Sequence, residues 1–295
     1  MGRDVASASP AAAEAFRKAD SVLGYELSQI CFEGPAEKLE CTDIQQPAIF
    51  VTSVAVWEAL REKGVSLSWF EAAAGLSLGE YTALHVAGSL TFEDALRLVQ
   101  QRGRLMQEAA EANPSGMVSL VGADEAAARA LCEKAAQGEV LSPANFNCPG
   151  QIVISGSRAA CGRALELAGE VGCRAVPLKV AGAFHSALMA SAADGLAAVL
   201  TSTPIRAPAI PVISNVTGEA HGEPEAIRAA LVQQLTHPVL WQRSMESLIA
   251  RGIQRFVEVG AGRVLKGLMR KIDRTAEVLC AGTAAELEVN LAPAC

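Results

Sequence analysis

Three long segments in the first part of the chain repeat their apolar residues with the spacing of a helix. Segment 11–27 has this spacing, and 47–64 reads as a longer amphipathic helix closed by a glycine. A third predicted helix ends near residue 112, with Thr91 as its N-cap, acidic residues in its first turn and Pro114 just beyond its end. The hydrophobic pattern therefore predicts a chain that begins helix-rich.

Between residues 116 and 180 the pattern changes to short strand-like and helical segments that alternate. Predicted helices at 125–136 and 158–171 interrupt four strand-like runs, "GMVSLVGA", "EVLSPANFN", "GQIVISGS" and "CRAVPLKV". This β-α-β-β-α-β order is the ferredoxin-like pattern. We therefore predict that 116–180 is an inserted small domain of that class.

Strands and helices continue to alternate after the insertion. Helices are predicted at 186–200 and 224–235, a β stretch at "PAIPVISNVTG", and a strand, glycine turn and helix in "IQRFVEVGAGRVLKGLMRKI". Alternation on both sides of the insertion is typical of an α/β domain with a parallel sheet. We expect one discontinuous large α/β domain made of residues 1–115 and 181–295.

Composition and charge exclude several classes of protein. Of the 295 residues, 51% are hydrophobic and 19% charged, and no apolar run approaches the length of a membrane span, so we expect a folded cytoplasmic protein with no membrane partner. The net charge of −7 argues against a nucleic-acid partner. The eight cysteines are scattered without the spacing of a zinc site, and we interpret them as buried apolar residues or free thiols: Cys31, Cys41, Cys132, Cys148, Cys161, Cys173, Cys280 and Cys295.

The motif "GLSLG" at residues 75–79 is the first candidate for chemistry. A Gly-x-Ser-x-Gly between a strand and a helix can hold its serine, here Ser77, on a tight elbow, with the flanking glycines avoiding clashes as the backbone reverses. The segment that follows, "EYTALHVAG", is a predicted helix whose first N–H groups would point at the serine oxygen. On this pattern alone, an ordinary glycine-rich loop is an equal alternative.

A nucleophilic serine needs a base, and the chain has four histidines. His185 follows the strand that returns from the small domain and precedes a helix, which is a loop position typical of a catalytic base; a capping or core histidine is the alternative. His85 is expected to face away from the serine, on the helix that follows it. His221 lies in the polar run "GEAHGEPE", interpreted as a solvated loop, and His237 precedes a proline.

Arg102 lies in the middle of the predicted helix that ends near residue 112. The usual explanation for such an arginine is a side chain that reaches along the helix to solvent. If the helix packs beside the elbow, the guanidinium could instead hold a carboxylate through two parallel hydrogen bonds. That arrangement would select the thioester of a dicarboxylic acid.

Six segments together resemble one family of enzymes. The segments are "GLSLGEYTAL", "RLVQQRGRLMQEA", "SPANFNCPGQIVISG", "GAFHSALM", "QQLTHPVLW" and "VEVGAGRVLKGL". In order and spacing they resemble the malonyl-CoA:acyl-carrier-protein transacylases of bacterial fatty acid synthesis and the polyketide acyltransferase domains, over nearly the whole chain. The expected fold is α/β, with a parallel-sheet, α/β-hydrolase-like large domain and an inserted ferredoxin-like small domain. The implied reaction transfers malonyl from malonyl-CoA to the phosphopantetheine thiol of acyl carrier protein.

The resemblance also implies roles for individual residues. Ser77 would attack the thioester, His185 would act as base and then as acid, and Arg102 would bind the free malonyl carboxylate. The main-chain carbonyl of Gln234 would orient the histidine, and the Leu78 N–H would donate to the oxyanion. Further substrate contacts are implied for three residues: Phe184, Met106 and Asn147.

Two departures from the family pattern affect the predicted site. Leu76 stands where relatives usually have histidine, so a polar contact from that side chain is missing. Relatives also begin with a strand that ends in a Phe-Pro-Gly-Gln-Gly-x-Gln-like block, whose glutamine N–H gives half of the oxyanion hole, and Met1 lies just beyond where that block would end. We expect the loss of one such donor to lower the rate about 10²–10³-fold.

The implied partner is acyl carrier protein, which is acidic, so docking would need a local basic surface. The last strong helix carries basic residues near i, i+3, i+7 and i+8, with Arg274 near i+11: Arg263, Lys266, Arg270 and Lys271. An ordinary solvated helix face would show the same pattern. We expect a monomer that binds no metal or redox cofactor.

Other functions share parts of this pattern. A serine hydrolase or thioesterase needs the elbow and the histidine but no carboxylate clamp, so the role of Arg102 separates it from a transacylase. A trans-acting polyketide acyltransferase differs in its carrier protein. A catalytically silent module that binds carrier protein is a further alternative, because of the missing first strand.

Overall fold

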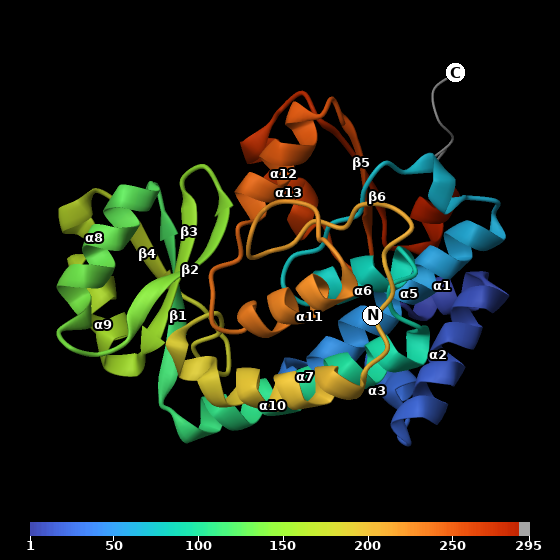
Figure 1. Cartoon of the computed structure of the whole chain (residues 1–295), viewed down its shortest axis with the longest axis horizontal. Helices are drawn as coiled ribbons and strands as arrows, with labels where there is room; N and C mark the ends of the chain where they lie inside the picture. The colour runs from blue at the N-terminus through green and yellow to red at the C-terminus, as the bar shows by residue number, and fades with distance from the viewer. Residues whose placement is uncertain (289–295) are drawn as a thin grey trace.

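The computed structural model describes residues 1–288. Helices dominate a larger lobe and a four-stranded sheet dominates a smaller one (Figure 1). The α-helices are α1 (Arg3–Ala8), α2 (Pro10–Leu23), α3 (Leu27–Glu33), α4 (Ala36–Glu40), α5 (Thr42–Glu62), α6 (Gly79–Val86), α7 (Phe92–Ala112), α8 (Glu125–Ala136), α9 (Arg158–Leu167), α10 (Ala190–Ser202), α11 (Pro224–Gln233), α12 (Trp241–Ala250) and α13 (Val264–Ile272). The strands are β1 (Ser115–Val121), β2 (Leu141–Cys148), β3 (Gln151–Ser157), β4 (Arg174–Pro177), β5 (Arg255–Val259) and β6 (Glu277–Ala281).

The smaller lobe is an antiparallel sheet with helices on one face (Figure 1). Its strand order is β2-β3-β1-β4, so β1 is central and pairs with both β3 and β4. Helices α8 and α9 pack on the sheet around a core that includes Leu120, Leu131 and Ile154. This order with two crossover helices is that of the ferredoxin-like fold, which confirms the predicted class of the small unit.

Helix α5 is enclosed by its neighbours along most of its length. It packs against α2 and α7, and 14 of its 21 residues are buried. The prediction of an amphipathic helix from residue 47 was wrong in its start and in its exposure, because α5 begins at Thr42 and is buried on all sides in its middle. Thr52 and Ser53, which are polar in the pattern, are small enough to pack inside the lobe.

The sheet of the larger lobe is parallel, as predicted, but its regular part is short. Strands β5 and β6 pair in parallel over five residues each. The predicted β stretch near residue 212 forms isolated bridges, in which Val212 pairs in parallel with Ala73 and Ile213 pairs with Ala220. Beside Ala73, this stretch has a hydrogen-bonding partner for only a few residues. A regular strand needs a longer partner, so the pairing stops at isolated bridges.

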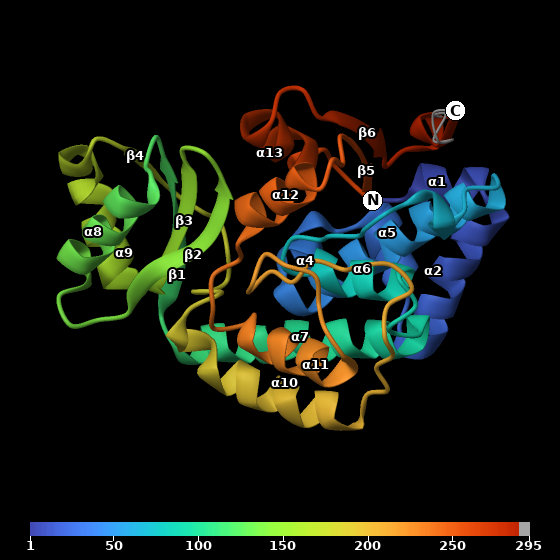
Figure 2. The ribbon, with the colours of Figure 1, turned by 45° about the horizontal axis from the view of Figure 1, so that its top comes forward.

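The chain passes between the lobes twice, and the second passage carries one of the predicted histidines. Helix α7 leads out into β1, and β4 leads back through residues 178–189 to α10, which packs beside α7 (Figure 2). The Ser115 Oγ accepts the Ala183 N–H at 3.1 Å and so ties the outgoing segment to the returning one. The returning segment contains His185. The exact boundaries of a large domain (1–115 and 181–295) and a small domain (116–180) stay a prediction.

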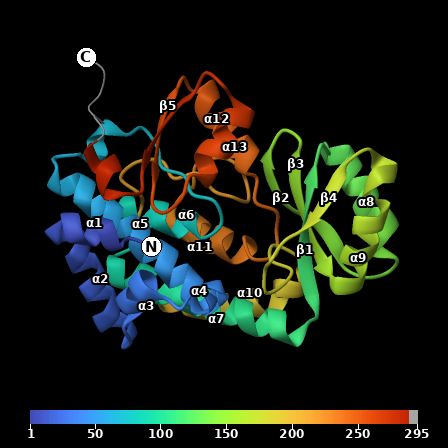
Figure 3. The same ribbon diagram turned by 180° about the vertical axis from the view of Figure 1, so that it is seen from behind.

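The first three helices lie at the end of the larger lobe that is remote from the small lobe (Figure 3).

No helix within residues 1–288 is long and apolar enough to cross a membrane. Seven cysteines in this range are free and all but Cys41 are buried, which agrees with their interpretation as buried apolar residues or free thiols. Cys295 lies outside the described residues.

Candidate active site

Ser77 lies on a sharp turn at the start of α6, with a backbone conformation that serine rarely adopts. Its φ is 51°, in the left-handed region, where the backbone of a residue other than glycine is strained. Asn215 holds the turn, because its Oδ1 accepts the Ser77 N–H at 2.6 Å and its Nδ2 donates to the Gly75 carbonyl at 2.8 Å. The serine is therefore on a tight elbow and not in an ordinary loop.

Close packing requires the first glycine of the motif but not the second. A Cβ added at Gly75 would lie 2.0 Å from the carbonyl carbon of Gly79. A Cβ added at Gly79 would meet no atom within 4 Å, so the prediction that both glycines prevent clashes was wrong for Gly79. The backbone folds back on itself at Gly75, whereas Gly79 is already the first residue of α6.

His185 lies in the returning segment and also has a left-handed backbone, with φ 58°. Its Nε2 is 2.9 Å from the Ser77 Oγ, and its Nδ1 is 2.7 Å from the main-chain oxygen of Gln234. Because a carbonyl oxygen can only accept, Nδ1 carries the hydrogen and Nε2 is left to accept the hydrogen of the serine hydroxyl. The group that orients this histidine is thus a main-chain carbonyl and not a carboxylate.

The surroundings hold the His185 imidazole neutral. The residue is 4% exposed, and burial, together with the positive charge of Arg102, lowers its pKa to about 4. The neutral form is the one that accepts a proton, so this base is available throughout the neutral pH range.

This pKa leads to a first prediction. The rate at which a serine-directed sulfonyl fluoride modifies Ser77 should be flat through neutral pH and fall only as the pH approaches about 4, because Nε2 then becomes protonated. The measurement is the rate of adduct formation by intact mass, within the pH range where the protein stays folded. A midpoint at the ordinary histidine value of 6.5 would contradict the described environment of His185.

Arg102 points from α7 into the same site. The residue is 1% exposed, and its guanidinium donates to the Ser77 Oγ at 2.9 Å, the Gln46 Oε1 at 2.6 Å and the Gln234 Oε1 at 2.8 Å. The Tyr81 ring centroid lies 5.3 Å from its central carbon. Burial lowers the pKa of Arg102, and no carboxylate within residues 1–288 forms an ion pair with it. A buried cation with only neutral direct partners makes the site suited to an anionic ligand.

An elbow serine, a neutral histidine and a buried arginine meet within hydrogen-bonding distance, and comparison with known proteins assigns the chain to a family. The family described as acyl transferase domain matches residues 1–284. The chain belongs to the acyl transferase family. It is 43% identical over 273 residues to the malonyl CoA-acyl carrier protein transacylase of Salmonella typhimurium, an alignment that covers 92% of this chain and 88% of that protein.

Solved structures of similar proteins confirm the fold of this acyl transferase. The malonyl CoA-acyl carrier protein transacylase of Coxiella burnetii superposes with a TM-score of 0.94 at 38% identity, over 97% of this chain and 90% of that one. A malonyl-transacylase in complex with its type II PKS acyl-carrier protein also gives a TM-score of 0.94, at 41% identity, over 97% of this chain and 93% of that one. The predicted α/β fold and the predicted family are therefore both confirmed.

Three amide side chains hold the acyl transferase site together, and none of these side-chain contacts was predicted from the sequence. Besides its main-chain carbonyl, Gln234 uses its side-chain Nε2 to donate to the Ser77 carbonyl at 3.0 Å and to the Glu80 Oε2 at 2.6 Å. Gln46 on α5 and Asn215 after the bridged stretch are the other two. Gln46 stands beside an apolar run and Asn215 within one, and a polar residue in that position is the signal that could have indicated a buried amide.

Two predicted site residues lie beside the reacting groups of the acyl transferase. Leu78 is the N-cap of α6, and its N–H makes no hydrogen bond with any residue in the described range, so it can donate to an oxyanion. Met106 is buried on α7 one turn after Arg102, and its Sδ is 3.4 Å from the Gln46 Nε2. Leu76, the second residue of the elbow motif, packs against the apolar cluster of α12 and α13.

Phe184 and Asn147 lie at the small lobe's side of the site. Phe184 directly precedes His185 and packs against Met117, Ala144 and Val153, on the face of the small sheet that α8 and α9 leave uncovered. Asn147 is buried on β2, and its Oδ1 has no hydrogen-bond partner among the described residues. It makes no hydrogen bond with the serine, histidine or arginine, so its role in substrate binding stays a prediction.

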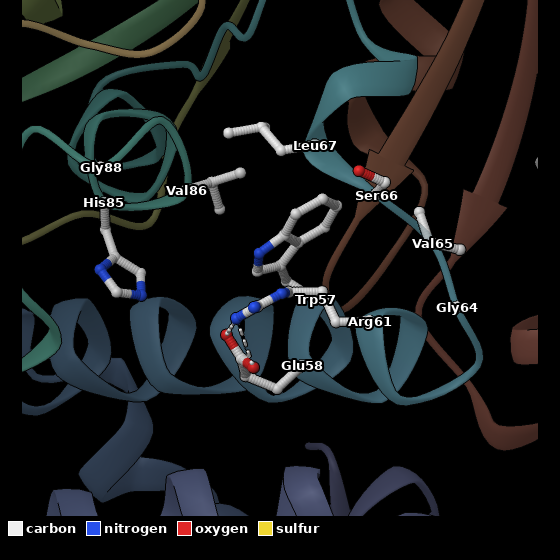
Figure 4. Close-up of a pocket in the computed structure, with 10 residues that line it drawn as sticks. All are labelled: Trp57, Glu58, Arg61, Gly64, Val65, Ser66, Leu67, His85, Val86 and Gly88. Atoms are coloured by element: carbon white, nitrogen blue, oxygen red, sulfur yellow. Dashed lines mark hydrogen bonds and ion pairs between the residues drawn. The ribbon is translucent and has the colours of Figure 1, made fainter.

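The rings of His85 and His237 contact groups other than Ser77, His185 and Arg102. The His85 Nδ1 donates to the Leu90 carbonyl at 3.1 Å, and the ring packs near Phe50 and Phe92. His85 lines a separate cavity of about 560 Å³, which is also lined by Trp57 of α5 and by the loop that follows α5 (Figure 4). The prediction that His85 faces away from the serine is therefore confirmed. His237 is exposed beyond the end of α11.

The prediction that His221 lies in a solvated loop was wrong. Its side chain is 1% exposed, and its Nε2 is 2.6 Å from the Glu80 Oε1. The polar run folds back on the preceding stretch, because Ala220 bridges Ile213 and the His221 N–H donates to the Val212 carbonyl at 2.8 Å. This turn directs one polar residue of the run inward, which the composition of the run does not reveal.

The basic residues predicted as a docking surface are all exposed, on α13 or directly before it: Arg263, Lys266, Arg270 and Lys271. Arg263 pairs with Glu286, and the Lys271 Nζ donates to the Gln151 Oε1 at 3.1 Å. Val264 lies among them and is 68% exposed. The acyl transferase thus has a basic surface with an apolar residue within it, and carrier docking there stays a prediction.

Proposed function

We propose that this acyl transferase moves the malonyl group from malonyl-CoA to the phosphopantetheine thiol of acyl carrier protein, and so loads extender units for fatty acid synthesis. The observation that carries the proposal is the buried Arg102 guanidinium, which contacts the Ser77 Oγ and has no ion pair within residues 1–288. A cation taken out of water is stabilised by an anion that arrives with the substrate, and the free carboxylate of malonyl is such an anion. The names of the transacylases described above support this donor and this acceptor.

In the first half of the cycle, Ser77 is the nucleophile. Its hydroxyl gives its proton to the His185 Nε2 while its oxygen bonds to the thioester carbon, and the Leu78 N–H donates to the resulting oxyanion. The carbon–sulfur bond then breaks, and the proton held by His185 passes to the sulfur of coenzyme A. The products are a malonyl ester on Ser77 and free coenzyme A.

In the second half, the phosphopantetheine thiol is the nucleophile. His185 takes the thiol proton as the sulfur bonds to the ester carbon, and the bond between that carbon and the serine oxygen then breaks. The proton on His185 returns to the Ser77 oxygen. The enzyme is restored and the carrier protein holds the malonyl thioester.

Arg102 holds the malonyl carboxylate through both halves of the cycle in this proposal. Its Nη2 already donates to the Ser77 Oγ at 2.9 Å, so the guanidinium faces the reacting atom. A planar guanidinium can bind a carboxylate through two parallel hydrogen bonds, which fix the orientation of the acyl group. A fixed malonyl ester presents its carbonyl carbon to the incoming thiol in one geometry.

The experiment that tests the proposal compares donors and acceptors. The protein is given malonyl-CoA or acetyl-CoA together with a holo acyl carrier protein of fatty acid synthesis, and the carrier is analysed by mass. We expect malonyl carrier protein to form faster than acetyl carrier protein and faster than free malonate is released. Release of malonate without acylated carrier would contradict the transferase and favour the serine hydrolase.

A polyketide carrier protein is a second candidate acceptor. The observation that favours it is the similarity to the malonyl-transacylase in complex with its type II PKS acyl-carrier protein. Supplying both kinds of holo carrier in competition distinguishes the two, because the physiological acceptor should be acylated with the higher kcat/KM.

We also propose that the carrier protein docks on the basic surface of α13, for which complementary charge and exposure are the support. Reversing two charges, with Arg270→Glu and Lys271→Glu together, should raise KM for the carrier about tenfold and leave the loading of Ser77 from malonyl-CoA unchanged. Arg17→Glu with Arg61→Glu, two exposed charge reversals on α2 and α5, is the matched control and should leave KM unchanged. An unaltered KM for the carrier in the α13 variant would contradict docking there.

We propose that the protein works in the cytoplasm. The proposed donor is a coenzyme A thioester, and the seven cysteines within the described range are free thiols, which suits a reducing compartment.

A further inference from the structure

Glu80 and His221 form a buried pair directly behind the elbow. The Glu80 side chain is 0% exposed and that of His221 is 1% exposed, and 2.6 Å separates the Glu80 Oε1 from the His221 Nε2. Because a carboxylate oxygen accepts, the His221 Nε2 carries the hydrogen. Neither side chain is hydrogen-bonded to the Ser77 hydroxyl, the His185 ring or the Arg102 guanidinium, so neither takes part directly in the proposed chemistry.

The second oxygen of Glu80 connects this pair to the backbone of Ser77. Its Oε2 accepts from the Gln234 Nε2 at 2.6 Å and from the Asn215 N–H at 3.2 Å. The same Gln234 Nε2 donates to the Ser77 carbonyl at 3.0 Å, and the Asn215 Oδ1 accepts the Ser77 N–H at 2.6 Å. The two partners of one carboxylate oxygen therefore hold the two polar backbone groups of the strained serine.

Gln234 extends the connection to the other two reacting groups. Its Oε1 accepts from the Arg102 Nη2 at 2.8 Å, and its main-chain oxygen accepts from the His185 Nδ1 at 2.7 Å. A single glutamine thus contacts the arginine, the histidine and the serine. Its amide can face only one way, because its Oε1 accepts from Arg102 while its Nε2 donates to the Glu80 carboxylate.

His221 fixes the carboxylate on which this arrangement depends. It comes from the same turn as Asn215, and the bridge between Ile213 and Ala220 brings both residues to Glu80. Without a donor at its Oε1, the buried carboxylate would have an unsatisfied oxygen and would rotate or shift toward another donor. Either change would alter what its Oε2 offers to Gln234 and to the Asn215 N–H.

We propose that His221 is a positioning residue of this acyl transferase, which acts through Glu80 on Gln234 and Asn215 and so fixes the geometry of Ser77, His185 and Arg102. The substrate named in this inference, malonyl-CoA, rests on the proposed function. The geometry does not, since the same contacts position the serine for any electrophile. Small displacements of reacting groups can cost on the order of 10²-fold in rate.

The test compares three replacements of His221. His221→Gln places an amide nitrogen near the position of Nε2 and keeps the donor to Glu80, His221→Asn keeps an amide that is too short to reach it, and His221→Leu removes the donor. The readouts are the single-turnover rate of malonyl loading on Ser77 from malonyl-CoA and the rate of Ser77 modification by phenylmethanesulfonyl fluoride, with thermal unfolding as the measure of folding. His237→Leu, the loss of an exposed histidine, is the matched control.

We expect His221→Leu and His221→Asn to lower both rates by on the order of 10²-fold, and His221→Gln and His237→Leu to stay close to the unmodified protein. Folded Leu and Asn variants with unaltered rates would overturn the proposal. If the leucine variant does not fold, equal rates for the Gln and Asn variants would overturn it. If the unmodified protein reacts with the sulfonyl fluoride but accepts no malonyl, the proposed function fails, while slower sulfonylation of the Asn and Leu variants would still support the positioning role.

Discussion

Replacing Arg102 with alanine is expected to lower kcat/KM for malonyl transfer about 10²–10³-fold. The physical reason is that the variant leaves the malonyl carboxylate without its partner at a buried position, where a lost charged partner typically costs about 2–5 kcal/mol. Acetyl-CoA has no free carboxylate and should lose much less. The preference for malonyl over acetyl should therefore collapse, which is measured as steady-state transfer of each acyl group to holo carrier protein.

Two further variants make this experiment specific. Arg104 lies two residues along α7, is exposed and pairs with Glu108, so Arg104→Ala is a matched control that should keep both rates. Arg102→Lys keeps the charge but not the planar fork, and should retain only part of the malonyl rate. Equal losses of malonyl and acetyl transfer in Arg102→Ala would contradict a carboxylate clamp and indicate that Arg102 only supports the site.

Replacing His185 with alanine is expected to slow the loading of Ser77 about 10²–10⁴-fold, because the hydroxyl then has no base within hydrogen-bonding distance. The measurement is the single-turnover appearance of the malonyl adduct by intact mass near neutral pH. His237→Ala is the control, since that histidine is exposed and its ring contacts Thr236 and the Gln233 carbonyl, not Ser77. A folded His185→Ala variant that loads at the unaltered rate would contradict the assignment of the base.

The elements that the sequence predicted well are those that local signals define. Helix α7 was predicted because its apolar period is regular and Thr91 caps it, with the Thr91 Oγ1 accepting the Asp94 N–H at 3.1 Å. Strands β1 to β4 are short runs bounded by turns, and α8 lies where its pattern placed it. Elements that depend on tertiary partners were predicted poorly: α5 is surrounded by other helices, and β6, which was not predicted, is a short strand that depends on its pairing with β5.

The candidate site shows the same division. Ser77, His185 and Arg102 could be found because each is a reactive or charged residue in an unusual local context. Their roles rested on a family resemblance as well as on that context. The convergence of Glu80, Asn215 and the side chain of Gln234 could not be predicted, because nothing in the local sequence shows that three distant segments meet behind the elbow. His221 was misplaced for a related reason, since a run of polar residues gives no sign of which one a turn directs inward.

The left-handed backbones of Ser77 and His185 also could not be predicted from the sequence. Both residues carry side chains that disfavour a positive φ, with values of 51° and 58°, and both are held there by hydrogen bonds from other segments. Strain of this kind persists only when the surrounding structure determines it. It places the two side chains 2.9 Å apart, which is the geometry that proton transfer between them requires.

The most direct measurement is the intact mass of the protein after brief incubation with malonyl-CoA, beside a Ser77→Ala variant shown to be folded. We predict a single malonyl adduct on the unmodified protein, none on the variant, and loss of the adduct when holo carrier protein is added, with malonyl appearing on the carrier. No adduct on the folded unmodified protein, or an adduct that persists in Ser77→Ala, would contradict the central claim that Ser77 carries the acyl group.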